Sequence, residues 1–355
     1  LLFVEGGVAI TGGQFWLLAG ELLSPDQARR HFPSFSLAGG VGALVAGAAA
    51  HLAPVVGQRG FTALLVVPAA ACVALAAVSL RRYAHRVGPR PGAGQPAFSA
   101  EVRGRLELIK GSSLLVAIGL LTALVTACGI TIDFVFTRAV AQTHPDGAAT
   151  FLGDVAIAIN GLQLVLVAAF GARLFTTFGL VRTFYSYPLG GLLAALAGLP
   201  FGPAGPSVGL RVFDRLENFL VLNPGLGIAL AAFPRERRGR ASLWYGGLVK
   251  PLAIGVTGGV LLGLRDSPQA VWLLVGVGFL AALPLLQRRA TVYRDTLLDN
   301  LKSDDPQLVA SSIEALAEPE NRAVVPRLLE VMQQSADPVL AENVLRAAGT
   351  IRDPR

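Results

Sequence analysis

The chain of 355 residues is apolar for its length: 53% of its residues are hydrophobic, 15% are charged, and its mean hydropathy is +0.58. Soluble proteins carry about 25% charged residues, because polar side chains must cover their surface, so the composition excludes an ordinary soluble domain. The net charge of +7 does not indicate nucleic-acid binding, because the basic residues lie between apolar runs, as they do in the cytoplasmic loops of membrane proteins.

About nine apolar segments are each long enough to cross a membrane as a helix, which takes about 20 residues. They are predicted at 1–23, 35–56, 61–80, 113–134, 151–175, 179–199, 207–233, 248–264 and 268–286. Small residues recur every fourth position at 39–47, 190–198 and 255–263, and this spacing predicts close helix packing along these faces. Asn223-Pro224 lies within the seventh segment and is expected to break or kink its helix.

The longest interruption between these segments, 81–112, is polar, basic and rich in Gly and Pro, which predicts a loop between two helical bundles. Basic residues also alternate between the connections. One set of connections carries nearly all of them, and the other set holds only Arg59, Arg138 and Arg265. Because basic loops stay in the cytoplasm, the loop 81–112 and the C-terminal end are predicted to be cytoplasmic.

Three spans, a long basic loop and six further spans fit a major-facilitator bundle that lacks its first three spans, since each half of such a bundle has six. About nine of the twelve helices would then be present. Residues 1–80 are predicted as spans four to six of the N-terminal half, 81–112 as the linker, and 113–287 as spans seven to twelve. The chain has no initiator Met and stops at Arg355, so we expect a fragment cut at both ends.

Placing an ionisable residue at the membrane centre costs at least about 2.5–3.5 kcal/mol. Each such residue within an apolar span is therefore expected to have a structural or functional role. Four polar residues of the seventh segment lie at i, i+3, i+4 and i+7 and therefore form one stripe of a helix; they are Arg211, Asp214, Arg215 and Asn218. The stripe is either part of a polar path for an anionic solute, or an internal salt-bridge cluster or membrane-edge stripe. The predicted path consists of Glu5, Asp133, Arg211, Asp214, Arg215 and Lys250.

The connection 171–182 has spaced glycines followed by basic residues, and in this it resembles a degenerate copy of the major-facilitator loop motif. The matching residues are Gly171, Arg173, Gly179 and Arg182. The resemblance implies that this loop takes part in gating between the two halves of the bundle.

After residue 287 the chain becomes charged, and 288–355 is predicted as a cytoplasmic helical segment. Asp305-Pro306 recurs 32 residues later as Asp337-Pro338. A further helix is expected between them, at 324–333. Helix pairs of this period resemble HEAT repeats, and a proline is tolerated in the first turn of each helix. About one and a half repeats are too few to be stable alone, so we expect more repeats to follow and to offer a surface for a partner protein.

Several short motifs occur along the chain in a particular order. They are Phe15-Trp16, Gln27-Ala28-Arg29-Arg30, Asp133-Phe134, Phe151-Leu152-Gly153-Asp154, Asn223-Pro224, Phe233-Pro234 and Pro251-Leu252. This order resembles the ATP/ADP carriers, the nucleotide translocases of plastids and intracellular bacteria, and the fusion to HEAT-like repeats resembles a bacterial branch. The resemblance implies a multi-pass transporter of the bacterial inner membrane that works by alternating access and carries a nucleotide or another anionic metabolite.

In that family, buried acidic and basic groups handle the nucleotide phosphates and the coupling. Glu5 and Asp133 match acidic positions of the fourth and seventh spans, and Lys250 lies one turn before the lysine position of the eleventh. The charged pair that usually follows the Asn-Pro step is replaced here by Leu226-Gly227. This departure leaves an alternative open, in which the protein is a transport-inactive membrane scaffold or sensor that acts through its HEAT-like repeats.

The sequence gives no indication of an enzyme, a cofactor or a metal site. It contains no Walker A loop, no His-Glu-x-x-His and no Gly-x-Ser-x-Gly motif, which are the patterns of common phosphate, zinc and hydrolase sites. The four histidines are scattered without ligand spacing, and both cysteines, Cys72 and Cys128, fall inside apolar runs, which is typical of small core residues.

Overall fold

The computed structural model describes residues 112–316, except 146, 202, 203, 231 and 304, then 338–351 and seven isolated residues. The predicted spans at 1–80 and nearly all of the linker 81–112 therefore lie outside the described residues. Every regular element described is helical, which confirms the all-α prediction. The α-helices are α5 (Ser113–Thr143), α6 (Ala148–Phe178), α7 (Leu180–Phe184), α8 (Ser186–Gly198), α9 (Gly205–Glu217), α10 (Asn223–Leu230), α11 (Arg235–Trp244), α12 (Lys250–Leu264), α13 (Pro268–Asn300), α14 (Pro306–Leu316) and α16 (Pro338–Ile351).

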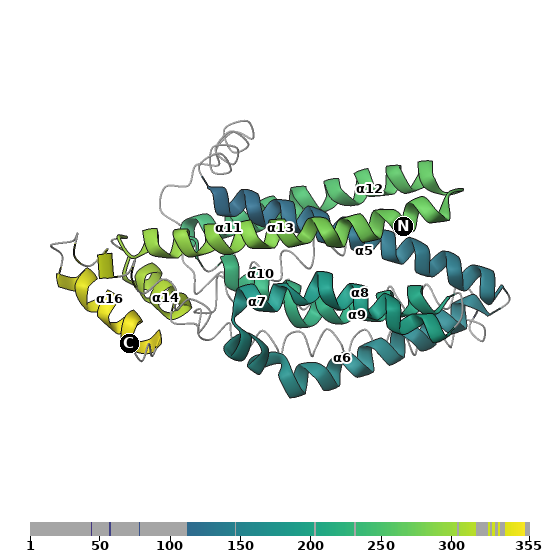
Figure 1. Ribbon diagram of the computed structural model, residues 1–355, viewed down its shortest axis with the longest axis horizontal. Helices are drawn as coiled ribbons and strands as arrows, with labels where there is room; N and C mark the ends of the chain where they lie inside the picture. The colour runs from purple at the N-terminus through teal and green to yellow at the C-terminus, as the bar shows by residue number, and fades with distance from the viewer. Residues whose placement is uncertain are drawn as a thin grey trace.

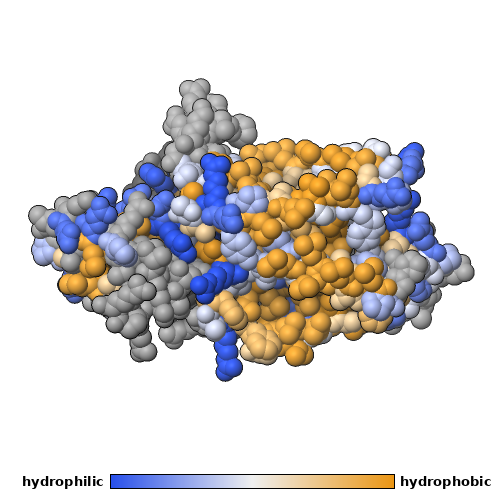
Figure 2. All heavy atoms as spheres, viewed as in Figure 1, coloured by the Kyte–Doolittle hydropathy of each residue, from blue (hydrophilic) through white to orange (hydrophobic). Residues whose placement is uncertain are grey.

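Five of the described helical stretches are long and apolar enough to cross a membrane: Ser113–Thr143, Thr150–Phe170, Leu180–Phe201, Arg237–Leu264 and Pro268–Asn300. They coincide with five of the six spans predicted in 113–287. Their outer faces carry many exposed large apolar side chains, and Figure 2 shows these as a broad hydrophobic surface with hydrophilic residues at its two ends. Such a surface matches a lipid environment. This confirms the prediction that the chain is a membrane protein.

The sixth predicted span, 207–233, is helical but is not among the five apolar helices. The chain runs through α9, a turn η2 (Asn218–Leu222) and α10 without leaving helical geometry. Its first half carries Arg211, Asp214, Arg215 and Glu217, and this charge lowers its hydropathy below that of its neighbours. Asp214 and Glu217 are buried inside the bundle, so the charges of this helix lie partly against protein rather than lipid.

The small-residue face at 190–198 packs as the spacing predicts. Helices α8 and α9 lie side by side and run antiparallel (Figure 1). A Cβ added at Gly198 would overlap the backbone of Gly205, and one added at Gly209 would lie 3.3 Å from the carbonyl carbon of Ala194 and nearer still to its oxygen. The two helices therefore approach at backbone contact distance, which only small residues allow.

The corresponding prediction for 255–263 is wrong. Gly255, Gly259 and Gly263 lie on the exposed face of α12, and none has a described neighbour within 4 Å of its missing Cβ. The buried face of α12 consists of Thr257 and Leu261 instead. Spacing alone does not distinguish a packing face from a smooth lipid-facing one, because both place small residues on one side of the helix. The third such face, 39–47, falls outside the described part of the chain.

Two helices widen into π-helical turns where the chain meets a proline. In η2 the N–H of Asn223 donates to the carbonyl of Asn218, five residues back, immediately before Pro224. In η3 (Tyr245–Val249) the N–H of Lys250 donates to Tyr245 in the same way, immediately before Pro251. A proline cannot donate to the carbonyl four residues back, and a π turn accommodates this loss. Of the predicted break or kink at Asn223-Pro224, the break is wrong, because the helix continues through a local widening.

Helix α13 connects the membrane bundle to the C-terminal segment. It begins at Pro268, a favourable first position, and continues as 33 residues well past the predicted end of the span at 286. Beyond it, α14 and α16 both begin at the recurring prolines, Pro306 and Pro338, and pack against each other (Figure 1). The predicted intervening helix, 324–333, lies mostly outside the described residues.

One buried apolar cluster includes residues of both the bundle and the C-terminal segment, among them Leu230, Phe233, Leu297, Ile313 and Val344. At its edge, the side-chain amide of Asn300 donates to the carbonyl oxygen of Ala232 at 2.8 Å and to the hydroxyl of Ser312 at 3.2 Å. Asn300 therefore ties the segment after α10 to α14.

Replacing Asn300 with alanine is expected to lower the free energy of unfolding by about 1–2 kcal/mol, since it leaves the buried Ala232 carbonyl and Ser312 hydroxyl without these donors. Thermal unfolding of the purified protein in detergent measures the effect. Lys302→Ala, two residues on and exposed, is the matched control and should leave the midpoint unchanged. Equal midpoints for both variants would contradict the structural role of Asn300.

Candidate functional site

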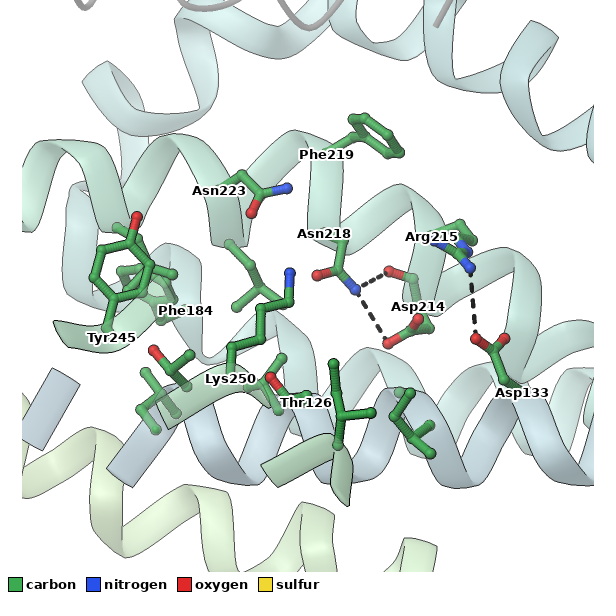
Figure 3. Close-up of a pocket in the computed structure, with 18 residues that line it drawn as sticks. Thr126, Asp133, Phe184, Asp214, Arg215, Asn218, Phe219, Asn223, Tyr245 and Lys250 are labelled. Carbon is green, nitrogen blue, oxygen red and sulfur yellow. Dashed lines mark hydrogen bonds and ion pairs between the residues drawn. The ribbon is translucent and has the colours of Figure 1, made fainter. Parts of the chain in front are cut away.

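A cavity of about 200 Å³ lies within the helical bundle (Figure 3). Four parts of the chain meet at it. They are one face of α5, the end of α7, and two helices that are each interrupted by a π turn, one through η2 and the other through η3. Its polar lining residues are Thr122, Thr126, Asp133, Asp214, Arg215, Asn218, Asn223, Tyr245 and Lys250. Both π turns contribute to the lining, η2 through Asn218 and η3 through Tyr245. The proline-induced widening therefore occurs at the cavity wall, and π turns of this kind are frequent at functional sites.

Asp133, on α5, faces two arginines of α9. Arg211 makes a close ion pair with Asp133, and Arg215 approaches the second carboxylate oxygen at 3.5 Å. Arg215 is the more exposed of the two arginines, at 40% of its side chain against 17% for Arg211. One carboxylate thus serves two guanidinium groups, and its contact with Arg215 is the looser one.

Asp214 projects from the same helix but is almost completely buried, at 3% exposure. The side-chain amide of Asn218 donates to it at 3.2 Å, and the hydroxyl of Tyr187 lies 3.5 Å from the same oxygen. Buried charges persist where hydrogen bonds and nearby opposite charges compensate for the lost water. Asp214 is therefore held in place by its neighbours, whereas the side chain of Arg215 is 40% exposed.

The ammonium group of Lys250 is directed into the cavity from the start of α12, toward the side of Asn218 and Asn223 (Figure 3). Thr122 and Thr126 lie one turn apart on α5 and add hydroxyl groups to the wall. The hydroxyl of Thr122 is buried and makes no hydrogen bond to the described residues. The cavity thus combines cationic groups with uncommitted hydrogen-bonding groups.

The structure brings together most of the predicted polar path. Asp133, Asp214, Arg215 and Lys250 line the cavity, and Arg211 joins them through Asp133. Glu5 lies outside the described residues. Sequence reasoning missed Glu217, which is buried at 6% exposure and accepts a hydrogen bond from the hydroxyl of Ser186. The signal was present, because Glu217 follows Asp214 by three residues and so falls on the same stripe of the helix.

The predicted gating loop is mostly not a loop. Gly171 and Arg173 are helical residues of α6, which continues to Phe178, and Arg182 belongs to α7. The helix is interrupted at Gly179, whose φ of +78° favours glycine. None of these residues lines the cavity, but α7, which Gly179 introduces, ends at the cavity-lining Phe184.

The fold and the cavity define a helical membrane protein with a charged internal cavity. Comparisons of the chain with protein-family models, with curated proteins and with solved structures find no match. The functional argument therefore depends on the geometry of the cavity.

Proposed function

We propose that the protein is a secondary transporter of an anionic metabolite, built like a major-facilitator bundle and working by alternating access in the bacterial inner membrane. The observation that carries the proposal is the arrangement of charge at the cavity. Arg215 and Lys250 line it together with Asp133 and Asp214, and Arg211 shares Asp133 with Arg215, so three cations and two carboxylates lie at the cavity. Charged groups inside a membrane bundle commonly mark a solute pathway.

The geometry also suggests how an anion is exchanged. Because Arg211 holds Asp133 closely, Asp133 keeps a counter-ion when Arg215 turns away. A phosphate or carboxylate group in the cavity would replace Asp133 as the partner of Arg215, in a charge-assisted and bidentate manner. Lys250 and the threonines of α5 would bind the rest of the solute. A nucleotide fits this chemistry and the resemblance to ATP/ADP carriers.

The π turns provide the flexibility that alternating access needs. Transporters move helical halves about a central site and use irregular helices there. Here η2 and η3 are such irregular points, and both lie at the cavity wall. Rotation about these turns would change the access to Arg215 and Lys250 without unfolding either helix.

The second candidate is a membrane scaffold or sensor that no longer transports. The specific observation in its favour is Leu226, which lines the cavity with an apolar side chain where the resembled family usually has charge. In this case the cavity charges are a structural network, and the C-terminal helices bind the partner.

Arg215→Gln is expected to raise the apparent KM for the transported anion about 10–100-fold, because it removes a charge-assisted hydrogen bond of the kind that contributes 1.5–3 kcal/mol. Uptake of labelled ATP, ADP and orthophosphate into proteoliposomes containing the full-length protein measures this. Arg215→Lys should retain part of the affinity, and Arg265→Gln, an exposed arginine away from the cavity, is the matched control.

Two results would contradict the proposal. The first is the absence of saturable uptake of any tested anion by the unmodified protein, which would favour the scaffold. The second is saturable uptake with the same KM in Arg215→Gln, which would place the solute elsewhere in the bundle.

A further inference from the structure

Arg289 is a buried cation that the cavity does not use. It lies on α13, three residues after Leu286, the last residue of its apolar stretch, and is only 4% exposed. Neither terminal nitrogen of its guanidinium group has a hydrogen-bond partner among the described residues. It packs against an aromatic ring: the guanidinium carbon lies 4.1 Å from the ring centroid of Phe184. Burying a guanidinium group without a carboxylate is unfavourable, and a cation–π contact compensates only in part.

Phe184 connects Arg289 to the cavity. Its ring is 2% exposed and belongs to the cavity lining. The ring also packs against α10, where a Cβ added at Gly225 would lie 2.6 Å from its outermost carbon. One side chain therefore contacts the cavity, the helix after the first π turn, and the buried arginine.

Phe184 lies at a junction between two helices. It is the last residue of α7, a helix of five residues that begins directly after Gly179, the positive-φ residue. Few backbone hydrogen bonds hold this short helix, but Leu180 and Phe184 are both only 2% exposed, so the ring turns only when the segment opens locally. Such a rotation would uncover the guanidinium group of Arg289 on the side that faces the cavity lining.

We propose that Arg289 is a second anion-binding residue, which a solute reaches when Phe184 turns away, and that Phe184 separates this position from the cavity. The ligand is a small anion with a phosphate or carboxylate group, since a guanidinium group binds both in a bidentate manner. This inference rests on the proposed transport function and adds an outer position to the anion pathway. Because Arg289 is buried in protein, we assign the anion to a free solute and not to a lipid head group.

Labelling of arginine with p-hydroxyphenylglyoxal, followed by peptide mass spectrometry, tests the proposal without a transport assay. The full chain is kept in a phosphate-free maltoside detergent, with and without ATP or orthophosphate. Arg289 should react slowly in the unmodified protein and about tenfold faster in Phe184→Ala, because local opening controls its exposure. ATP or phosphate should protect it in both proteins. The adjacent Arg288 is exposed and serves as the internal control, labelled rapidly and without protection.

Three results would overturn the inference. One is labelling of Arg289 at the same rate with and without the anions; another is an unchanged rate in Phe184→Ala and in the milder Phe184→Leu. The third is protection by added phosphatidylglycerol but not by ATP or phosphate, which would assign the position to a lipid. If Phe184→Ala does not fold, protection of the unmodified protein and of Phe184→Leu still decides the outcome.

Transport kinetics separate a failure of this inference from a failure of the proposed function. If the unmodified protein takes up anion, Arg289→Gln should raise KM for entry from the predicted cytoplasmic side with little change in kcat, and Arg289→Lys, which keeps the charge but not the bidentate geometry, should restore it in part. Uptake that is the same in Arg289→Gln would refute the role of Arg289 alone. An absence of uptake, with anion protection of Arg289 retained, would refute transport and keep the binding position.

Discussion

Gly209→Leu is expected to separate α8 from α9 and to lower the free energy of unfolding by about 3 kcal/mol, at the upper end of the usual cost of overpacking. The reason is that the added Cβ would overlap the carbonyl of Ala194, a backbone group that cannot rotate away. Either the two helices move apart along their whole contact, or the variant does not assemble. Thermal unfolding in detergent and the yield of monodisperse protein measure the effect.

The matched control is Gly259→Leu. This glycine also lies in an apolar helix, but its face is exposed and has open space around it. The variant should be as stable as the unmodified protein, since it adds an apolar side chain on the outer surface. Gly209→Ala should give an intermediate loss, because its Cβ makes the same contact. A stable Gly209→Leu variant would show that the close approach of α8 and α9 is wrong.

Asp133→Ala is expected to lower the free energy of unfolding by about 2 kcal/mol, less than the 3–5 kcal/mol for fully buried pairs because these side chains are partly exposed. The change leaves Arg211 and Arg215 close together without their shared carboxylate. The two positive charges then repel each other at a partly buried site, which is the main source of the loss.

A double-mutant cycle tests whether the loss comes from this charge. Arg211→Met removes the closer cation with little change in side-chain length, so Asp133→Ala combined with Arg211→Met should be more stable than Asp133→Ala alone. Additive effects of the two changes would contradict the ion pair. Arg265→Met provides a control at an exposed arginine, for which no rescue is expected.

The positions of the membrane helices could be predicted from hydrophobic runs, because a helix in lipid must be apolar over its whole length. Their ends could not. Helix α13 continues to Asn300, since the residues after Leu286 bury against the C-terminal segment rather than in lipid. In the same way α5 extends to Thr143, beyond the apolar run that ended at Phe134. A polar residue ends a hydrophobic pattern, but it does not end a helix.

The candidate site could be predicted in its charges but not in its backbone. The stripe from Arg211 to Asn218 follows from helical spacing, and it does face the cavity through Asp214 and Arg215. The π turn at Tyr245–Val249 was not predicted, because a proline after Lys250 reads equally well as the start of a new helix. The burial of Arg289 was not predicted either, since an arginine just past an apolar run normally remains in water.

The length of α13 has a practical consequence. Its 33 residues correspond to about 50 Å at 1.5 Å per residue, whereas the hydrocarbon core is about 30 Å thick. About 20 Å of this helix, which contains Pro284, is therefore expected to extend beyond the lipid, where it packs against α14. A tilt of this helix within the membrane would be magnified at its far end. An antibody fragment that binds the C-terminal helices would therefore move when α13 tilts, and its displacement would report motion of the bundle from outside the membrane.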